Sequence, residues 1–128
     1  MGVIYAAALR TTRMNDVKTA IDAGSGAGYI EIGTTAMASV LATITLTDPC
    51  GSVSGDVLTF TMPHSDTSAD NTGTAAAARI KDSDGNIIVS GLTVGLSASN
   101  IVLDSLSITA GQTVTLTAAT LTHNTSGV

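Results

Sequence analysis

Apolar and polar residues alternate over several short stretches of the chain, which is the pattern of β-strands with one buried face. The alternation is clearest in 39–47, 56–62 and 113–121, where aliphatic residues and threonines take turns. Successive side chains of a strand point to opposite faces, so one set in each stretch is expected to face a core. Those sets are Val40, Ala42, Ile44 and Leu46; Leu58, Phe60 and Met62; and Val114, Leu116 and Ala118.

Shorter strands are predicted between these stretches, separated by turn residues such as the Asp84-Gly85 pair. Residues 48–52 are predicted to form a turn, and 64–73 a polar loop. Many short strands with turn signals between them predict an antiparallel β-sandwich or a barrel-like domain. The predicted strands are 29–33, 39–47, 56–62, 74–81, 86–90, 101–103, 106–108 and 113–121.

The segment 6–23 has helical spacing instead, with apolar positions at steps of three and four. Gly24 follows it as a residue that can take the left-handed conformation that closes a helix. We therefore expect a single mainly β domain over 1–128, with an arm at 1–5, one N-terminal α-helix at 6–23 and the β-sandwich over 29–122. The face expected to pack on the sheet is made by Leu9, Arg13, Val17, Ala20 and Ile21, with Met14 beside it.

The core of this domain must be aliphatic, because the chain has no tryptophan, one phenylalanine and two tyrosines. A thin core of this kind is often backed by oligomerisation or by docking onto a partner. Charged residues make up 12% of the chain, against ~25% in typical domains. The net charge is −5, and no segment gathers enough positive charge to predict nucleic-acid binding. No apolar stretch approaches the ~20 residues of a membrane helix. No secretory signal is recognised, so synthesis in the cytoplasm is expected.

Candidate chemistry is sparse. Cys50 is the single cysteine, so it cannot form an internal disulfide, and no base stands near it in the sequence. The glycines of 24–28 faintly resemble a phosphate-binding loop, but no Lys-Ser or Lys-Thr follows them. Asn124-Thr125-Ser126 has the form of a glycosylation sequon, which carries no meaning without a secretory signal. No cofactor is expected.

A hydrolytic triad can be drawn from Ser65, Asp66 and either His64 or His123. The Gly-x-Ser-x-Gly elbow that would place such a serine between a strand and a helix is missing. Because serines and threonines are abundant, some serine will lie near some aspartate by chance. We therefore expect no catalytic residue and no enzymatic activity.

Two polar clusters have the oxygen-rich side chains that calcium prefers. They are Asp82, Asp84 and Asn86 in one turn, and Asp66, Asp70 and Asn71 in the 64–73 loop. Glu31 is the single glutamate of the chain, so neither cluster has the closing bidentate glutamate of an EF-hand. Asp and Asn also satisfy backbone amides in ordinary turns, which is the favoured interpretation. No metal site is predicted, although adventitious calcium stays open as an alternative.

Several stretches resemble, in order, a group of small structural proteins from the virions of tailed bacteriophages and from prophages. The stretches are IDAGSGAGYIEI at 21–32, LATITL at 41–46, ADNTGTA at 69–75, ARIKDSDG at 78–85, NIVLD at 100–104, ITAGQTV at 108–114 and LTH at 121–123. The chain departs from the group at Ala77, where an aromatic residue is often found, and at Gly33-Thr34, which replaces a Tyr-Thr-Gly type of strand end.

The resemblance implies a non-enzymatic protein of the virion, made in the bacterial host cytoplasm. The first expectation is a capsid decoration or cement protein that binds the assembled head lattice. Its partners would be the major capsid protein or other virion proteins, with contacts between copies or a homo-oligomer. The alternative is a tail, connector or fibre-associated module that recognises a protein or a glycan.

The surfaces expected to make such contacts are the arm Gly2 to Tyr5 and the exposed threonine faces. The helix holds three of the five basic residues, Arg10, Arg13 and Lys18. These three side chains either face an acidic partner or form an ordinary solvated helix face.

Overall fold

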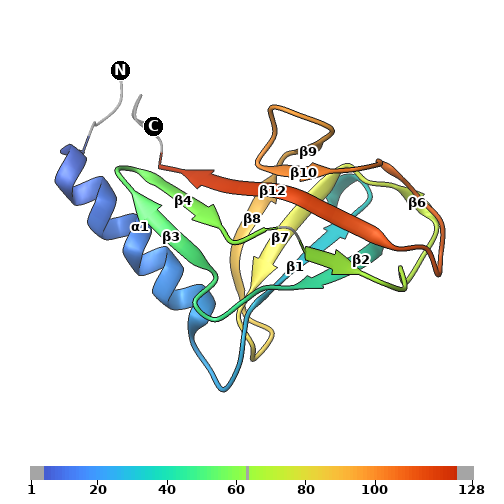
Figure 1. Cartoon of the computed structure of the whole chain (residues 1–128), viewed down its shortest axis with the longest axis horizontal. Coiled ribbons are helices and arrows are strands. Elements are labelled where there is room, and N and C mark those ends of the chain that lie inside the picture. Colours follow the sequence, from blue (N-terminus) through green and yellow to red (C-terminus); the bar gives the residue numbers. More distant parts are fainter. Residues whose placement is uncertain (1–4, 63, 124–128) are drawn as a thin grey trace.

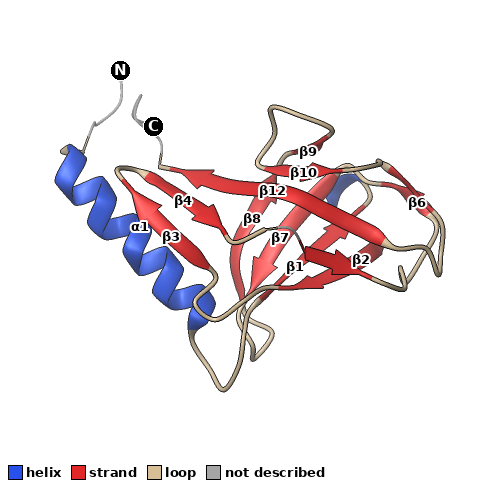
Figure 2. Ribbon diagram, in the orientation of Figure 1, coloured by secondary structure: helices blue, strands red, loops and turns tan. Residues whose placement is uncertain are grey.

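Two β-sheets form the body of the protein in a sandwich-like arrangement, and one helix lies along its side (Figures 1 and 2). The computed structural model describes residues 5–62 and 64–123. It confirms a mainly β domain with one N-terminal helix and antiparallel sheets. The elements are α1 Ala7–Asp22, the short 3-10 helix η1 Thr35–Met37, and the strands β1 Tyr29–Gly33, β2 Val40–Thr45, β3 Gly51–Ser54, β4 Val57–Phe60, β5 His64–Asp66, β6 Gly73–Thr74, β7 Ala77–Lys81, β8 Ile87–Leu92, β9 Val94–Gly95, β10 Ile101–Leu103, β11 Ser107–Ile108 and β12 Val114–Thr122.

The four-stranded sheet has the order β2-β1-β7-β8, and the six-stranded sheet runs β3-β4-β12-β10-β9 with β5 also paired to β12. The long strand β12 organises the second sheet, because its end pairs with β4 and its beginning with β5 on the same side. Strands β6 and β11 form a separate pair. Among the pairings of the described chain, β9 with β10 is parallel and the others are antiparallel.

Aliphatic side chains from both sheets fill the space between them, as the composition predicted. Within the part of the chain that the structure describes, Phe60 is the single aromatic residue of this core. The largest fully buried side chains are Ile30, Ile32, Leu41, Ile44 and Ile80 from the four-stranded sheet, Leu58, Ile101, Leu103, Val114 and Leu116 from the six-stranded sheet, Ile108 of β11, and Ile21 from the helix.

The strands expected from apolar alternation are present, although their ends are shifted. The predictions for 48–52 and 64–73 are wrong in part, because β3 begins inside the expected turn and β5 lies inside the expected loop. Strand β9 was not predicted either. The missed strands are short, and β3 and β5 are rich in polar residues, so little or no apolar alternation marks them. Backbone pairing with β4, β12 and β10 holds them in place.

Two bulges change which side chains face the core. The register of β10 with β12 shifts at Thr117, whose hydroxyl donates a hydrogen bond to the carbonyl of Val102 at 3.2 Å. An extra residue in one strand reverses the inward and outward faces beyond it. Ala118 is therefore exposed and Ala119 buried, opposite to the prediction. A second shift, between β1 and β2, inserts Leu41, which is fully buried although the alternation placed it outward.

The helix is confirmed to within one residue at each end, but its buried face differs from the prediction. Met14 and Ile21 are buried and Val17 is half-buried, whereas Leu9 is 45% exposed. At about 100° per residue, Leu9 lies about 140° around the helix from Met14, so both cannot face the sheet. Arg13 is exposed as well. The helix contacts the core through a stripe made of Met14, Val17 and Ile21, which are spaced at steps of three and four.

Gly24 ends the helix with a positive φ of 98°, as predicted. A side chain at this position would also collide with the neighbouring turn, because a Cβ atom would lie 2.0 Å from the hydroxyl of Ser83. The same hydroxyl donates a hydrogen bond to the carbonyl of Ala23 at 3.1 Å. The end of the helix is therefore joined to the turn between β7 and β8.

Helix α1 runs along β3, the outermost strand of the six-stranded sheet (Figure 1). The hydroxyl of Thr11 donates to the carbonyl of Gly55 at 2.6 Å, and the carboxylate of Asp22 accepts from the amide of Cys50 at 2.9 Å. Thr11 and Asp22 are about 16 Å apart along a helix, and Cys50 and Gly55 are about 16 Å apart along a strand. The helix is thus hydrogen-bonded at both ends of the strand that it covers.

Two of the other outer strands, β8 and β9, have irregular or short edges. Strand β8 shifts register twice against β7, and β9 has two residues. Bulges and short length both keep an edge from pairing with another chain. Together with the helix over β3, these features leave little regular edge for a neighbouring strand at β3, β8 and β9.

We expect Ile21→Ala to lower the free energy of unfolding by about 2–5 kcal/mol, because it removes a fully buried side chain from the contact between the helix and the sheets. Leu9→Ala, on the exposed side of the same helix, should change it by less than about 0.5 kcal/mol. Urea unfolding followed by circular dichroism measures both. Equal losses for the two variants would contradict this assignment of the buried face.

Candidate functional site

The cluster around Asp66 caps the free edge of β2. One carboxylate oxygen of Asp66 accepts a hydrogen bond from the amide of Thr43 at 3.0 Å, and the other accepts from the amide of Ser68 at 3.0 Å. Thr43 lies on the edge strand of the four-stranded sheet, and Asp66 ends β5 of the other sheet. A single side chain therefore joins the two sheets at this corner.

Asp70 and Asn71 extend the same cap. The amide of Asp70 donates to the carbonyl of Leu41 at 2.7 Å, and the side-chain amide of Asn71 donates to the carbonyl of Val40 at 2.7 Å. Both carbonyls belong to β2, and a buried backbone group without a partner is costly. These polar residues, first considered as calcium ligands, supply the hydrogen bonds that a neighbouring strand would otherwise supply.

The Asp82 cluster forms a closed turn. One oxygen of Asp82 accepts from the amides of Asp84 and Asn86 at 3.0 and 2.9 Å, and the other from the side-chain amide of Asn86 at 3.1 Å. The hydrogen bonds from Asn86, and then those from the turn amides, lower the pKa of Asp82. The turn interpretation of Asp82, Asp84 and Asn86 is confirmed. Within residues 5–62 and 64–123, no group of three or more His, Cys, Asp or Glu side chains is placed to hold a metal ion.

The residues of the possible triad are not brought together. His64 and Ser65 are neighbours in β5, so their side chains point to opposite faces of the sheet. The hydroxyl of Ser65 lies 3.2 Å from that of Thr115, and Asp66 is bonded to Thr43 and Ser68. The ring of His123 packs edge-on against Tyr5, with centroids 5.9 Å apart. Among His64, Ser65 and Asp66, no hydrogen bond pairs a nucleophile with a base in the part of the chain that the structure describes.

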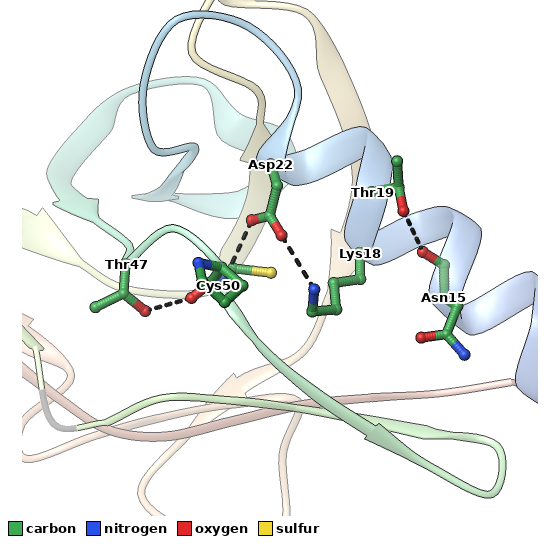
Figure 3. A network of polar contacts seen from close by, with 7 residues as sticks. Asn15, Lys18, Thr19, Asp22, Thr47 and Cys50 are labelled. Carbon is green, nitrogen blue, oxygen red and sulfur yellow. Dashed lines mark hydrogen bonds and ion pairs between the residues drawn. The ribbon is translucent and has the colours of Figure 1, made fainter.

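Cys50 is fully buried beneath the end of α1 (Figure 3). Burial raises the pKa of its thiol to about 12, and the nearby negative charge of Asp22 adds to the effect. Asp22 also accepts the backbone amide of Cys50 and pairs with Lys18, whose nitrogen lies 3.4 Å from the carboxylate. The nucleophilic form of cysteine is the thiolate, so this environment favours a structural thiol.

Close packing explains Gly28 in the glycine-rich segment after the helix. A Cβ atom on Gly28 would lie 2.6 Å from the carbonyl oxygen of Lys81 and 2.7 Å from that of Ile21. Gly28 must therefore be glycine for the chain to pass between the helix and β7. This packing accounts for Gly28 without a bound phosphate.

Each of the five basic residues contacts a side chain of its own chain. Arg10 pairs with Asp56 at 3.4 Å, Lys18 pairs with Asp22 at 3.4 Å, and the guanidinium of Arg13 lies 4.6 Å from the centre of the Tyr5 ring. Arg10 also donates to the carbonyl of Tyr5. These contacts tie the helix to its own surroundings and leave Arg13 as the most exposed of the three helix cations.

The other two basic residues flank Glu31 on the outer face of the four-stranded sheet. Arg79 and Lys81 of β7 lie 2.6 and 3.1 Å from one oxygen of Glu31 in β1. Burial raises the pKa of Glu31, but the hydrogen bonds and charges of Arg79 and Lys81 outweigh it, so the pKa is lowered overall. This cluster is a cross-strand ion-pair group that supports the sheet.

A hollow of about 280 Å³ opens between α1, β8 and the end of β12. Its lining is mainly apolar and carries no charged side chain. Sequence reasoning missed it because its residues come from distant parts of the chain. The lining residues are Met14, Val17, Val89, Leu92, Asn100, Leu121 and Thr122, and we call this hollow the apolar groove.

Two sequence predictions lie outside the described residues, namely the arm up to Ile4 and the sequon at 124–126. Helix α1 is too short and too polar to cross a membrane, and the same holds for any helix of the described chain. Comparisons with protein-family models, with curated proteins and with solved structures find no match to this chain.

We expect Asp66→Ala to lower the free energy of unfolding by about 1–3 kcal/mol, because it leaves the amide of Thr43 without its charged acceptor. Asp104→Ala removes the same charge from an exposed side chain with no hydrogen bond among the described residues, and should be nearly neutral. Denaturant unfolding of both variants makes the comparison. If the two variants lose the same stability, Asp66 acts through its charge and not through the edge of β2.

The Cys50 thiol should resist a thiol reagent at pH 8 in the folded protein and react fully once denaturant unfolds it. Its pKa is raised from the ordinary 9.0, so the stability that comes from the neutral thiol is complete below pH 9.0 and is lost as pH rises toward about 12. Asp22→Ala should speed the reaction in the folded state, because it frees the end of the helix. Rapid labelling of Cys50 in the native protein would contradict the burial of its thiol.

Proposed function

We propose that this protein is a non-enzymatic structural component of a tailed-phage virion, and within the virion a decoration protein of the capsid. It binds the assembled head lattice through the major capsid protein or other virion proteins. The proposal rests on the family resemblance of the sequence together with the way in which the fold uses its polar side chains.

The observation that carries the proposal is the structural use of the reactive residues. Cys50 is buried, Ser65 and His64 point apart, and Asp66 and Asp82 accept backbone amides. Asp66, Asp82 and Cys50 thus belong to the hydrogen bonding and packing of a strand edge, a turn and the end of the helix. A chain whose polar groups serve its own fold suits a building block better than an enzyme.

The covered edges support the same role. Decoration proteins stand side by side in many copies, where an open strand edge would pair with any neighbour. Here the edge of β2 is capped by side chains and β3 is covered by α1. Contacts between copies would then be made by exposed faces and loops. On a lattice, many weak contacts of one kind add up to a high overall avidity.

The second candidate is a tail, connector or fibre-associated binding module. One feature favours it, namely the loop between β9 and β10, which projects from the sandwich and carries Leu96 with 60% of its surface exposed (Figure 1). Sandwich domains that recognise a protein or a glycan commonly do so through loops at one end. Copy number separates the two candidates.

Quantitative mass spectrometry of purified virions tests the proposal, with particles from the source phage or an induced prophage. A decoration protein should be present in numbers comparable to the major capsid protein. A few copies per particle would favour the connector or fibre module. Absence of the protein from the particle would refute the structural function.

A further inference from the structure

The side of helix α1 that points away from the sheets carries a row of four residues, which we call the outer stripe. It consists of Leu9, Arg13, Asp16 and Ala20, at steps of four, three and four. The first three are exposed and Ala20 is partly exposed. At about 100° per residue, the four positions lie about 100–160° around the helix from the buried Met14. Figure 1 shows α1 on the outside of the body, so the outer stripe faces solvent.

Two opposite charges in the middle of the outer stripe lack a charged partner within the described chain. The carboxylate of Asp16 makes no hydrogen bond or ion pair with another described residue. The guanidinium of Arg13 lies over the ring of Tyr5, 4.6 Å from its centre, and contacts no described carboxylate. The other four basic residues each pair with a carboxylate. Stacking on a ring uses the flat face of a guanidinium, so its N–H groups stay available to an acceptor.

The outer stripe is complementary to itself in charge. When two copies of α1 pack antiparallel about a twofold axis between positions 14 and 15, position 13 of each helix meets position 16 of the other. Each Arg13 then faces an Asp16, and each Leu9 faces an Ala20. A parallel pair would instead place Arg13 against Arg13 and Asp16 against Asp16. Because like charges oppose association, the charge pattern selects the antiparallel arrangement.

We propose that the outer stripe of one copy docks antiparallel on the outer stripe of a second copy, with two Arg13–Asp16 ion pairs across the axis. This proposal rests on the proposed function, since it supplies a contact between copies of a lattice protein. Steps of four and three give the average spacing of 3.5 residues at which two helices stay in contact. The outer stripe has no net charge, so two chains of net charge −5 can meet here without placing like charges together.

The contact is weak by itself, and its charges set its orientation more than its strength. Helix α1 has 16 residues and is therefore about 24 Å long, which is a small contact beside the roughly 1,200–2,000 Å² that stable interfaces bury. Exposed ion pairs add little affinity, but like charges placed opposite each other oppose a wrong arrangement. In solution the protein should therefore pair only at high concentration. A lattice that holds the copies close together strengthens the same contact.

Analytical ultracentrifugation of the full chain over rising concentrations tests the contact. The wild type should shift reversibly from monomer toward dimer as its concentration approaches about 1 mM. Arg13→Asp and Asp16→Arg should each weaken this association at least about tenfold, because each variant places like charges opposite one another at two positions. Circular dichroism checks that both variants keep the fold. A wild type that stays monomeric at about 1 mM, or variants that associate as it does, would overturn the proposal.

Mixing the two variants separates this contact from a general effect of charge. When an Arg13→Asp copy meets an Asp16→Arg copy, every position 13 faces a position 16 of opposite charge. The mixture should therefore associate, although each variant alone does so poorly. Asp104→Arg is the matched control, since it makes the same change of charge at an exposed residue outside the helix. If Asp104→Arg restores association with Arg13→Asp equally well, or if the two helix variants do not associate with each other, the ion pairs do not form.

Disulfide linkage reports the direction of the helices. A Leu9→Cys copy is mixed with an Ala20→Cys copy, each also carrying Cys50→Ala, and mild oxidation should link the two different chains. Leu9→Cys alone should stay unlinked, because the antiparallel arrangement keeps the two copies of position 9 apart. A Leu9→Cys protein that links to itself, or a mixture that does not link, would overturn the antiparallel pairing.

The failure of this contact and the failure of the proposed function are separable. A protein that is abundant in virions but does not associate through α1 would overturn only the contact between copies. A protein that associates through α1 but is absent from virions would refute the virion function and leave the contact standing.

Discussion

The structure depends on satisfying the backbone groups at the edges of its sheets. A strand at an edge presents amides and carbonyls that water or another chain must pair, and charged side chains usually protect it. This chain has few charges, so it uses different means at each edge. Asp66, Asp70 and Asn71 bond the edge of β2, helix α1 covers β3, and register shifts break the regularity of β8. Polar residues of the types that often bind metal ions therefore serve here as hydrogen-bond partners of the protein's own backbone.

The core is aliphatic because the chain has few aromatic residues. Without large aromatic anchors, the four-stranded sheet fills its inner face with rows of isoleucine and alanine side chains. Ile32 lies between Ala42 and Ala78, in the register that also places Ile30 between Ile44 and Ile80. The alanines leave room for the opposite layer, while the isoleucines supply the buried area. Helix α1 completes the core through Met14 and Ile21.

The sequence predicts the parts of the fold that leave a periodic trace. Strands β1, β2, β4 and β12 have apolar alternation, and the turn at Asp82 has the residue types that turns require. A bulge such as that at Thr117 leaves no trace, because it depends on the register with a distant strand. The role of Asp66 was equally hidden, since its partner Thr43 lies 23 residues earlier. The apolar groove collects residues from elements that meet only after folding.

The contact between the rings of Tyr5 and His123 has a consequence for the path of the chain. The described chain starts and finishes at one corner of the sandwich, and the two positions touch. A short linker could join them and the chain could be opened at the loop that carries Leu96 without removing any strand pairing outside that loop. A foreign peptide joined at residue 5 or at residue 123 would start from the same corner, so the sandwich is a natural scaffold for displaying a cargo there.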